Sequence, residues 1–202
     1  MTRIGLMPRL ERLTPADYRD IAWKNGGGVT SDILLYPQGA SHEDFDIRVS
    51  LAPIVAAGPF SSFPGIDRHI TLLSGNGLVL VFETAEHALA RLSPFYFDSV
   101  LAPVSRLNDG PVRVLNVMTR RGRWNAQVMA ISASGDPLLT PPEGGHAVLY
   151  AVAGLWQVSD GDAVVRIEPG DTLLSHGDAT LRATCEPGGE AVVAFLSPAF
   201  MP

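Results

Sequence analysis

The run Trp23–Thr30 is the stretch of this sequence whose residue types best suit ligand binding. Three consecutive glycines lose much backbone entropy on folding, so a geometric requirement should justify them. Glycine allows positive φ and lets backbone N–H groups approach a ligand, while Lys24, Asn25 and Thr30 add a charge, an amide and a hydroxyl. The order differs from a Walker A loop, which ends in Gly-Lys-Ser/Thr. We interpret the run as a candidate binding loop, and the alternative is an ordinary glycine turn beside a packed tryptophan.

The block Gly58–Arg68 is a second candidate. Its two prolines fix φ, and Phe60 and Phe63 provide apolar wall. A rigid loop that leads into a strand is suited to presenting the Arg68 guanidinium to an anion. The alternative is a structural loop in which Asp67 and Arg68 pair with other protein groups.

Polar side chains on two predicted strands could complete such a site. Within Phe45–Leu51 apolar and polar residues alternate, which places Arg48 and Ser50 on one face. A planar guanidinium matches both oxygens of a carboxylate, so Arg48 would clamp a carboxylate if this face lines the mouth of a barrel. Asn116 and Met118 share a face of another strand, where a polar amide needs a hydrogen-bond partner.

Sequence motifs for metal or cofactor chemistry are not found. The five histidines form no His-x-His pair, and none has a glutamate at the spacing of cupin metal sites. No Gly-x-Ser-x-Gly nucleophile elbow occurs. The turn Gly75-Asn76-Gly77 lacks the third glycine of a dinucleotide fingerprint. We therefore predict no metal ligand, no cofactor and no catalytic residue.

The elements that must position these residues are predicted to be short strands. The 20 glycines and 16 prolines are scattered along the chain, as expected for many strands joined by turns. Helical periodicity is nearly absent, and one helical turn is predicted at Thr14–Arg19, with Thr14 as its N-cap.

Two segments of the chain share one pattern. Arg68–Gly77 and Gly145–Gly154 each contain a histidine, an apolar strand and a glycine turn that leads into a second strand. The pattern predicts β-hairpins over His69–Phe82 and His146–Val158. Two such β-rich halves indicate tandem barrels or a two-sheet sandwich.

Composition narrows the class of protein. Among 202 residues, 46% are hydrophobic and 18% charged, which is enough apolar content for a sizeable core. The net charge of -6 argues against binding to nucleic acid or to an anionic membrane, because both need a basic surface. The sequence shows neither a signal peptide nor an apolar run of roughly 20 residues, so a cytoplasmic location is expected.

Four blocks of the chain resemble the HutD/Ves family, in the same order and at similar spacing. They are Trp23-Lys24-Asn25-Gly26-Gly27-Gly28-x-Thr30, Phe45-Asp46-x-Arg48-Val49-Ser50-x-Ala52, Gly58-Pro59-Phe60-Ser61-x-Phe63-Pro64-Gly65-x-Asp67-Arg68 and Asn116-Val117-Met118-x-Arg120-Arg121. One departure is Val114, where the family tends to have aspartate, so no role is assigned to that position. The resemblance implies an all-β fold of two tandem cupin-like (jelly-roll) β-barrels packed as a bicupin. We place the two halves in residues 1–135 and 136–202.

The resemblance also implies a function. Its HutD branch is linked to histidine catabolism, with a proposed regulatory role and formylglutamate-type ligands, and its Ves branch is associated with stress responses. We expect a small-molecule-binding regulator of histidine utilisation that takes N-formylglutamate or a related small carboxylate, and not an enzyme. The expected ligand-binding residues are Trp23, Lys24, Asn25, Gly27, Thr30, Arg48, Ser50, Phe60, Phe63, Arg68, Asn116 and Met118.

Two alternatives stay open at this point. A metal-independent cupin enzyme, an isomerase or lyase acting on a small acid, needs a general base in the same pocket. His69 directly follows Arg68, and Asp46 and Asp67 are the nearest carboxylates. A scaffold that acts through protein partners needs an exposed apolar patch. A homodimer is the default expectation, since cupin-like folds often pair.

Overall fold

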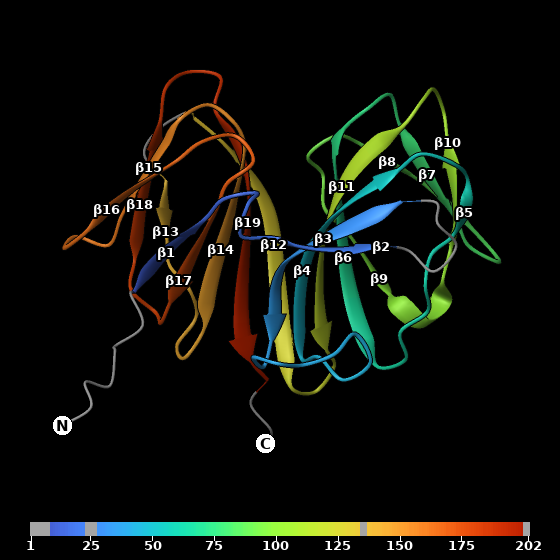
Figure 1. The fold of residues 1–202 in the computed structure, drawn as a ribbon, viewed down its shortest axis with the longest axis horizontal. Helices are drawn as coiled ribbons and strands as arrows, with labels where there is room; N and C mark the ends of the chain where they lie inside the picture. Colours follow the sequence, from blue (N-terminus) through green and yellow to red (C-terminus); the bar gives the residue numbers. More distant parts are fainter. Residues whose placement is uncertain (1–8, 23–27, 134–136, 200–202) are drawn as a thin grey trace. The chain divides into compact units, whose positions relative to one another are not determined.

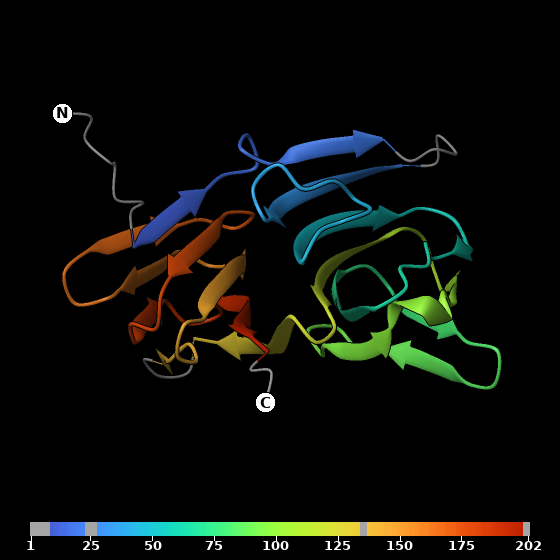
Figure 2. The ribbon, with the colours of Figure 1, turned by 90° about the horizontal axis from the view of Figure 1, so that it is seen from below.

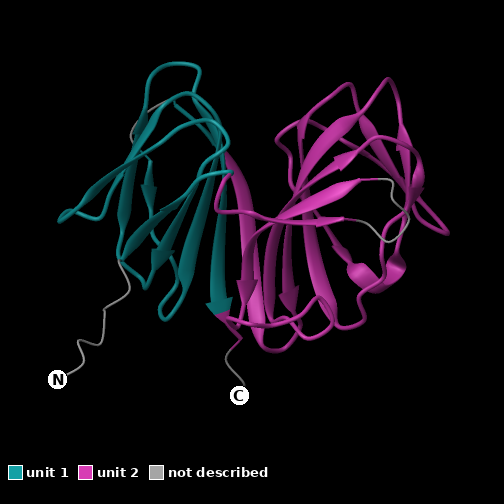
Figure 3. Ribbon diagram, viewed as in Figure 1, with its two compact units in different colours: residues 1–15, 131–197 teal, residues 16–130, 198–202 magenta. Residues whose placement is uncertain are grey.

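The computed structural model describes residues 9–22, 28–133 and 137–199, and the chain divides into two compact units (Figure 3). Unit 1 comprises Met1–Pro15 and Ile131–Ser197, and unit 2 comprises Ala16–Ala130 and Pro198–Pro202. The described residues form antiparallel sheets and one 3-10 helix, Ser99–Leu101 (Figure 1). The predicted all-β class is therefore confirmed. No helix in the described ranges is long and apolar enough to span a membrane.

The helical turn predicted at Thr14–Arg19 is wrong. Residues 15–17 form a turn, and Arg19 begins strand β2 (Arg19–Ala22), which pairs with β3 (Val29–Tyr36). A proline after a polar residue also suits position i+1 of a β-turn. The backbone groups after the turn are satisfied by the neighbouring strand instead of by the next helical turn.

Unit 2 contains two sheets. The strands of the larger sheet are β2, β3, β4 (Ile47–Ile54), β6 (Ile66–Ser74), β9 (Phe95–Asp98) and β11 (Val112–Arg120). They lie in the order β2-β3-β4-β11-β6-β9. The strands of the smaller sheet are β5 (Gly58–Pro59), β7 (Leu78–Val81), β8 (Glu86–Leu89) and β10 (Val104–Leu107), in the order β5-β10-β7-β8. Strand β12 (Trp124–Ser132) then leads the chain from unit 2 into unit 1.

Unit 1 also contains two sheets. One includes β1 (Leu10–Leu13), β14 (His146–Ala153), β17 (Thr172–His176) and β19 (Glu190–Pro198), in the order β1-β17-β14-β19. The other consists of β13 (Leu138–Leu139), β15 (Trp156–Ser159), β16 (Val164–Ile167) and β18 (Leu181–Cys185), in the order β13-β18-β15-β16. Because β1 pairs with β17, the N-terminal segment belongs to the unit that is otherwise formed by the C-terminal part of the chain, whereas the sequence placed residues 1–135 together.

The two units repeat one strand order. In unit 2 the orders are β9-β6-β11 and β5-β10-β7-β8, and in unit 1 they are β17-β14-β19 and β13-β18-β15-β16, with every strand number raised by eight. The segments that share a sequence pattern are therefore equivalent strands, β6 and β14. Within the described residues each unit keeps two separate sheets, whose strands curve around an interior (Figure 2).

The two predicted hairpins are wrong in their pairing. Strand β6 pairs with β11 and β9, and β7 pairs with β10 and β8, so the chain passes from one sheet to the other at the turn between β6 and β7. The same holds for β14 and β15. Gly75 makes this corner possible: its φ is +104°, and a Cβ there would lie 2.7 Å from the Pro111 carbonyl oxygen.

The interior of unit 2 lies between its two sheets. Ile70 and Leu72 of β6 pack in one cluster with Leu78 and Leu80 of β7, and each is at most 2% exposed. Successive strand residues point to opposite faces, so Arg68, two residues before Ile70, also faces this interior. Arg68 therefore lies on the same face of the sheet as the apolar cluster, at the end of that cluster.

Candidate functional site

Five of the predicted site residues occupy two neighbouring rows on the inner face of the larger sheet of unit 2. Arg48 of β4 is opposite Met118 of β11, and Met118 is opposite Arg68 of β6. In the next row Ser50 is opposite Asn116. All five are at most 7% exposed. Residues that lie opposite one another on paired strands have their side chains in contact range on one face, so the sheet gathers these five at one end of the interior.

The charge of Arg48 is compensated within the protein. Its Nε and Nη2 each donate to Oδ1 of Asp32 at 2.8 Å. The other oxygen of Asp32 lies 2.6 Å from Nε2 of His42. Asp32 is 5% exposed and Arg48 7%. Asp32 therefore occupies the guanidinium N–H groups of Arg48 that we expected to bind a ligand carboxylate.

The Arg68 guanidinium is surrounded by aromatic rings. Its Cζ lies 5.3 Å from the ring centroid of Phe60, 5.6 Å from that of Phe63 and 5.7 Å from that of Phe97. Its Nη2 donates to the sulfur of Met118 at 3.5 Å, which is a weak acceptor. Cations over aromatic faces gain about 0.5–2 kcal/mol each, depending on desolvation. The rings therefore hold the guanidinium in place without neutralising it.

Arg68 is a buried cation without a counter-ion among the described residues. It is 5% exposed, and its Nε and Nη1 have no hydrogen-bond partner in the described ranges. Burial, and after it the nearby charge of Arg48, lower the pKa of Arg68 to about 9. The group is still protonated at neutral pH, so one positive charge stays uncompensated in the interior.

Asn116 adds an unused acceptor next to this charge. Its Oδ1 is buried and accepts no hydrogen bond within the described part of the chain. Leaving a buried polar atom unpaired costs about 1–3 kcal/mol, so such an atom calls for an explanation. Asn116 is opposite Ile70 on β6, which makes it a diagonal neighbour of Arg68. A ligand that brings both an anionic group and an N–H donor would satisfy the two side chains together.

Of the other seven predicted site residues, three are described by the structure and four are not. Trp23, Lys24, Asn25 and Gly27 lie outside the described residues. The rings of Phe60 and Phe63 pack around the Arg68 guanidinium. Thr30 of β3 is half-buried, and since it precedes Asp32 by two residues it lies on the inner face of the sheet.

Sequence reasoning missed two residues of this site, Asp32 and Phe97. Asp32 lies in β3, which begins at Val29, and the polar residues two apart at its start, Thr30 and Asp32, were the available signal. Phe97 lies in Phe95–Asp98, an aromatic run that favours a strand. Both residues reach the site through pairing between distant strands.

The side chain of His69 faces away from this site. It follows Arg68 on β6, so the two side chains point to opposite faces of the sheet. The carboxylates considered as general bases are also engaged: Asp46 pairs with Arg120 and Arg123, and Asp67 pairs with Arg121. His69 therefore points away from Arg68, and each of the two carboxylates is paired with arginine.

A cavity of about 270 Å³ opens beside the candidate site. Its lining residues are His42, Glu43, Phe45, Ser62, Phe63, Pro64, Ile66 and Arg120. Phe63 belongs to both places, since its ring lines this cavity and also lies 5.6 Å from Arg68. Across the described ranges, no group of three or more His, Cys, Asp or Glu side chains is arranged to hold a metal ion.

Comparison with known proteins places the chain in a family. The family model described as HutD matches residues 15–193. This chain belongs to the HutD family. Among the relatives of this HutD-family chain, Protein Ves of Citrobacter koseri is 36% identical over 140 residues, which cover 68% of this chain and 70% of the relative. Protein Ves of Escherichia fergusonii is 33% identical over 162 residues, covering 79% and 80%.

Solved structures agree with the HutD assignment. HutD from Pseudomonas fluorescens SBW25 has a TM-score of 0.78 at 29% identity, covering 94% of this chain and 98% of that one. A conserved protein of unknown function from Pseudomonas aeruginosa PAO1 has a TM-score of 0.86 at 26% identity, covering 94% and 100%. The pirin YhhW of Escherichia coli, at a TM-score of 0.64 and 8% identity over 95% of this chain and 100% of that one, shows only the cupin-like fold.

Proposed function

We propose that this HutD-family protein binds a small molecule through a carboxylate held by Arg68 in the interior of unit 2. The observation that carries the proposal is the buried guanidinium with no ion pair among the described residues. Burying an uncompensated ion costs several kcal/mol even after the protein relaxes. An anion that enters this interior offsets that cost, and an arginine fork can hold both of its oxygens.

The charge balance limits how much of the ligand enters. Asp32 neutralises Arg48, so Arg68 leaves a single positive charge in the interior. One carboxylate balances this charge, and a second would be buried without a cation. A dicarboxylate therefore places one group on Arg68 and keeps the other outside the interior. In this proposal Arg48 fixes the position of Asp32 and does not bind the ligand.

The unpaired oxygen of Asn116 favours ligands with an N–H donor beside the carboxylate. An N-acyl amino acid has this combination, and N-formylglutamate is the example that the HutD branch suggests. The structure of HutD from Pseudomonas fluorescens was determined in a formate condition, and formate is the smallest probe for a carboxylate site. A regulatory role in histidine utilisation is the biological part of the proposal.

The proposal is tested by ligand-induced stabilisation. Thermal unfolding is followed with formate, N-formylglutamate, glutamate, urocanate and histidine. A ligand at about 100 times its Kd stabilises the folded state by roughly 2.7 kcal/mol. We expect N-formylglutamate to stabilise the wild type and to have no effect on Arg68→Met.

A matched control is Arg113→Met, because Arg113 lies on β11 and is exposed. This variant should keep the full response. No response of the wild type to any of the five compounds would overturn the proposal. So would an equal response in Arg68→Met.

We also infer that the two units are tandem cupin-like jelly-roll barrels of one bicupin. Their identical strand order supports this inference. A crystal structure tests it, since the paired sheets of each unit should close around one interior. Sheets that stay open in the crystal would contradict it.

A further inference from the structure

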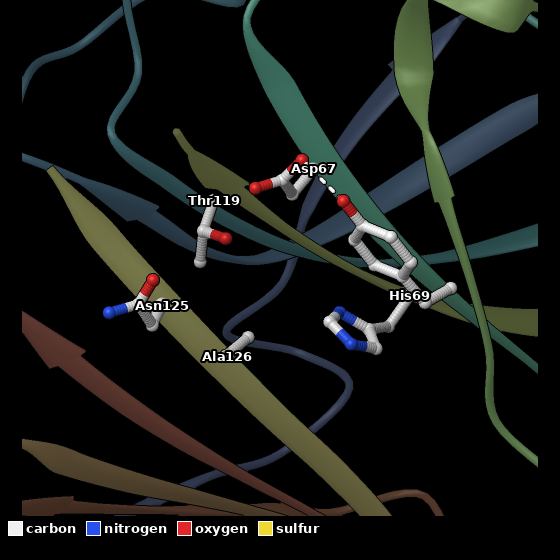
Figure 4. A pocket seen from close by; sticks show the side chains of 6 residues that line it. Asp67, His69, Thr119, Asn125 and Ala126 are labelled. Atoms are coloured by element: carbon white, nitrogen blue, oxygen red, sulfur yellow. Dashed lines mark hydrogen bonds between the residues drawn. The ribbon is translucent and has the colours of Figure 1, made fainter. Parts of the chain in front are cut away.

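A second cavity lies on the face of β6 that points away from Arg68. Its volume is about 280 Å³. The residues that line it are Asp67, His69, Tyr96, Thr119, Asn125 and Ala126 (Figure 4). Asp67 is opposite Thr119 on β11, and His69 is opposite Tyr96 on β9. Strand pairing therefore fixes four of the side chains around this cavity.

Asp67 keeps one carboxylate oxygen for a ligand. Its Oδ1 accepts from the Tyr96 hydroxyl at 2.9 Å and from Arg121 Nε at 3.0 Å. No hydrogen bond between described side chains ends on its Oδ2. Arg121 also pairs with Asp98 at 2.8 Å, so one arginine serves two carboxylates. Asp67, Asp98 and Arg121 together carry one net negative charge.

The aromatic side chains of the cavity are neutral. Burial lowers the pKa of His69 despite the opposing charge of Asp67, and its Nδ1 is buried with no hydrogen-bond partner in the described ranges. Burial and the hydrogen bond to Asp67 raise the pKa of the Tyr96 hydroxyl. The two rings lie 5.2 Å apart. They present π faces, which attract cations, and they add no positive charge.

We propose that this cavity binds a small organic cation with a primary ammonium group. The ammonium donates to Oδ2 of Asp67, and the side-chain oxygens of Thr119 and Asn125 are further acceptors. Ala126 lies beside them and offers apolar contact to an alkyl chain. An anion is disfavoured by the net negative charge. A bound metal ion is disfavoured as well, since no third His, Cys, Asp or Glu side chain of the described residues joins Asp67 and His69 here.

The experiment is a calorimetric or saturation-transfer titration of the full protein with n-propylammonium chloride. The matched probes are 1-propanol and sodium propionate, which have the same three-carbon skeleton without the ammonium group. We expect binding of propylammonium alone. Asp67→Asn should weaken it at least tenfold, which is the loss expected for one charge-assisted hydrogen bond. The control Glu86→Gln removes an exposed carboxylate of unit 2 that pairs with Arg106, and it should leave binding unchanged.

A second variant keeps the test valid if Asp67→Asn does not fold. Asn125 is exposed, so Asn125→Leu should fold and should fill part of the cavity, again with at least tenfold weaker binding. Equal binding of propanol and propylammonium, or unchanged binding in both variants, would overturn the inference. Arg68→Met should bind propylammonium like the wild type, so failure of the carboxylate proposal and failure of this one are separate results.

Discussion

Arg68 and His69 are consecutive residues of β6, and their side chains lie on opposite faces of the larger sheet of unit 2. Arg68 points into the interior, where it is a cation without a described counter-ion. His69 lines a separate cavity with a net negative charge. One strand thus separates two environments of opposite charge, because successive side chains of a strand alternate between faces.

The free energy of unfolding should rise when Arg68 is replaced by methionine. The substitution removes a buried charge and keeps an unbranched apolar side chain among the three phenylalanine rings. Replacing even a buried ion pair by apolar groups is often neutral or stabilises the fold by about 1–4 kcal/mol, and Arg68 has no counter-ion among the described residues. Urea unfolding without added anions measures the change, with the exposed Arg113→Met as control. A less stable Arg68→Met would show that the guanidinium is balanced by groups not described above.

The free energy of unfolding should fall sharply in Asp32→Asn. Asp32 is the carboxylate between Arg48 and His42, and without it the interior holds two uncompensated cations. Breaking a buried ion pair from one side typically costs about 3–5 kcal/mol. Sodium formate should recover part of the loss, because an anion can replace the missing carboxylate.

The control for Asp32 is Glu86→Gln, which breaks an exposed pair with Arg106. Exposed pairs contribute about 0–1 kcal/mol, so its effect should be small and independent of formate. Urea unfolding of each variant at matched ionic strength, with formate or with chloride, is the measurement. Equal stabilisation of wild type and Asp32→Asn by formate would contradict the charge balance proposed here.

Strand alternation was enough to predict which polar residues share a face. Arg48 with Ser50, and Asn116 with Met118, are i and i+2 pairs, and the structure places all four on the inner face. The partner of Arg48 could not be predicted in this way. Asp32 meets Arg48 because β3 pairs with β4, and the register of two strands depends on the packing of the whole sheet and not on a local pattern.

The turn between β6 and β7 shows the same limit. Glycine and asparagine correctly predicted a tight turn, and Gly75 and Gly77 both have positive φ. Whether the two flanking strands pair with each other is a separate question. Here β6 finds its partners in β11 and β9, since the apolar faces of both sheets are buried together only when the chain changes sheet at this corner.

Stability should decrease below about pH 6.5 because of two half-buried, neutral histidines. Burial lowers the pKa of His69, and burial followed by the charge of His176 lowers the pKa of His146. In the unfolded chain both histidines become protonated with a pKa near the ordinary value of 6.5. In the folded chain they become protonated only at lower pH. Unfolding therefore takes up protons as the pH falls from 6.5, and stability drops by at most about 1.4 kcal/mol per pH unit and histidine.

The matching variants are His69→Gln in unit 2 and His146→Gln in unit 1. Each should flatten the dependence of the unfolding free energy on pH between pH 7 and pH 5.5, and should leave this dependence unchanged above pH 7. Chemical unfolding at fixed ionic strength over this range is the measurement. An unchanged slope in both variants would exclude the two histidines as its source.

The N-terminal strand should contribute to the stability of unit 1 through one partly buried ion pair. Asp171 is 4% exposed, and its Oδ2 accepts from Arg12 Nε at 2.9 Å and Nη2 at 2.7 Å. Because Arg12 is 39% exposed, solvent screens part of this interaction. We therefore expect Arg12→Met to lower the free energy of unfolding by about 1–3 kcal/mol.

Arg9→Met is the matched control, since Arg9 lies in the same segment but reaches Asp160 only at 3.9 Å. The backbone N–H groups of residues 162 and 163 already donate to the carboxylate of Asp160. Urea unfolding of both variants is the measurement, and an equal loss would mean that strand pairing alone, and not the Arg12–Asp171 pair, holds β1 to β17.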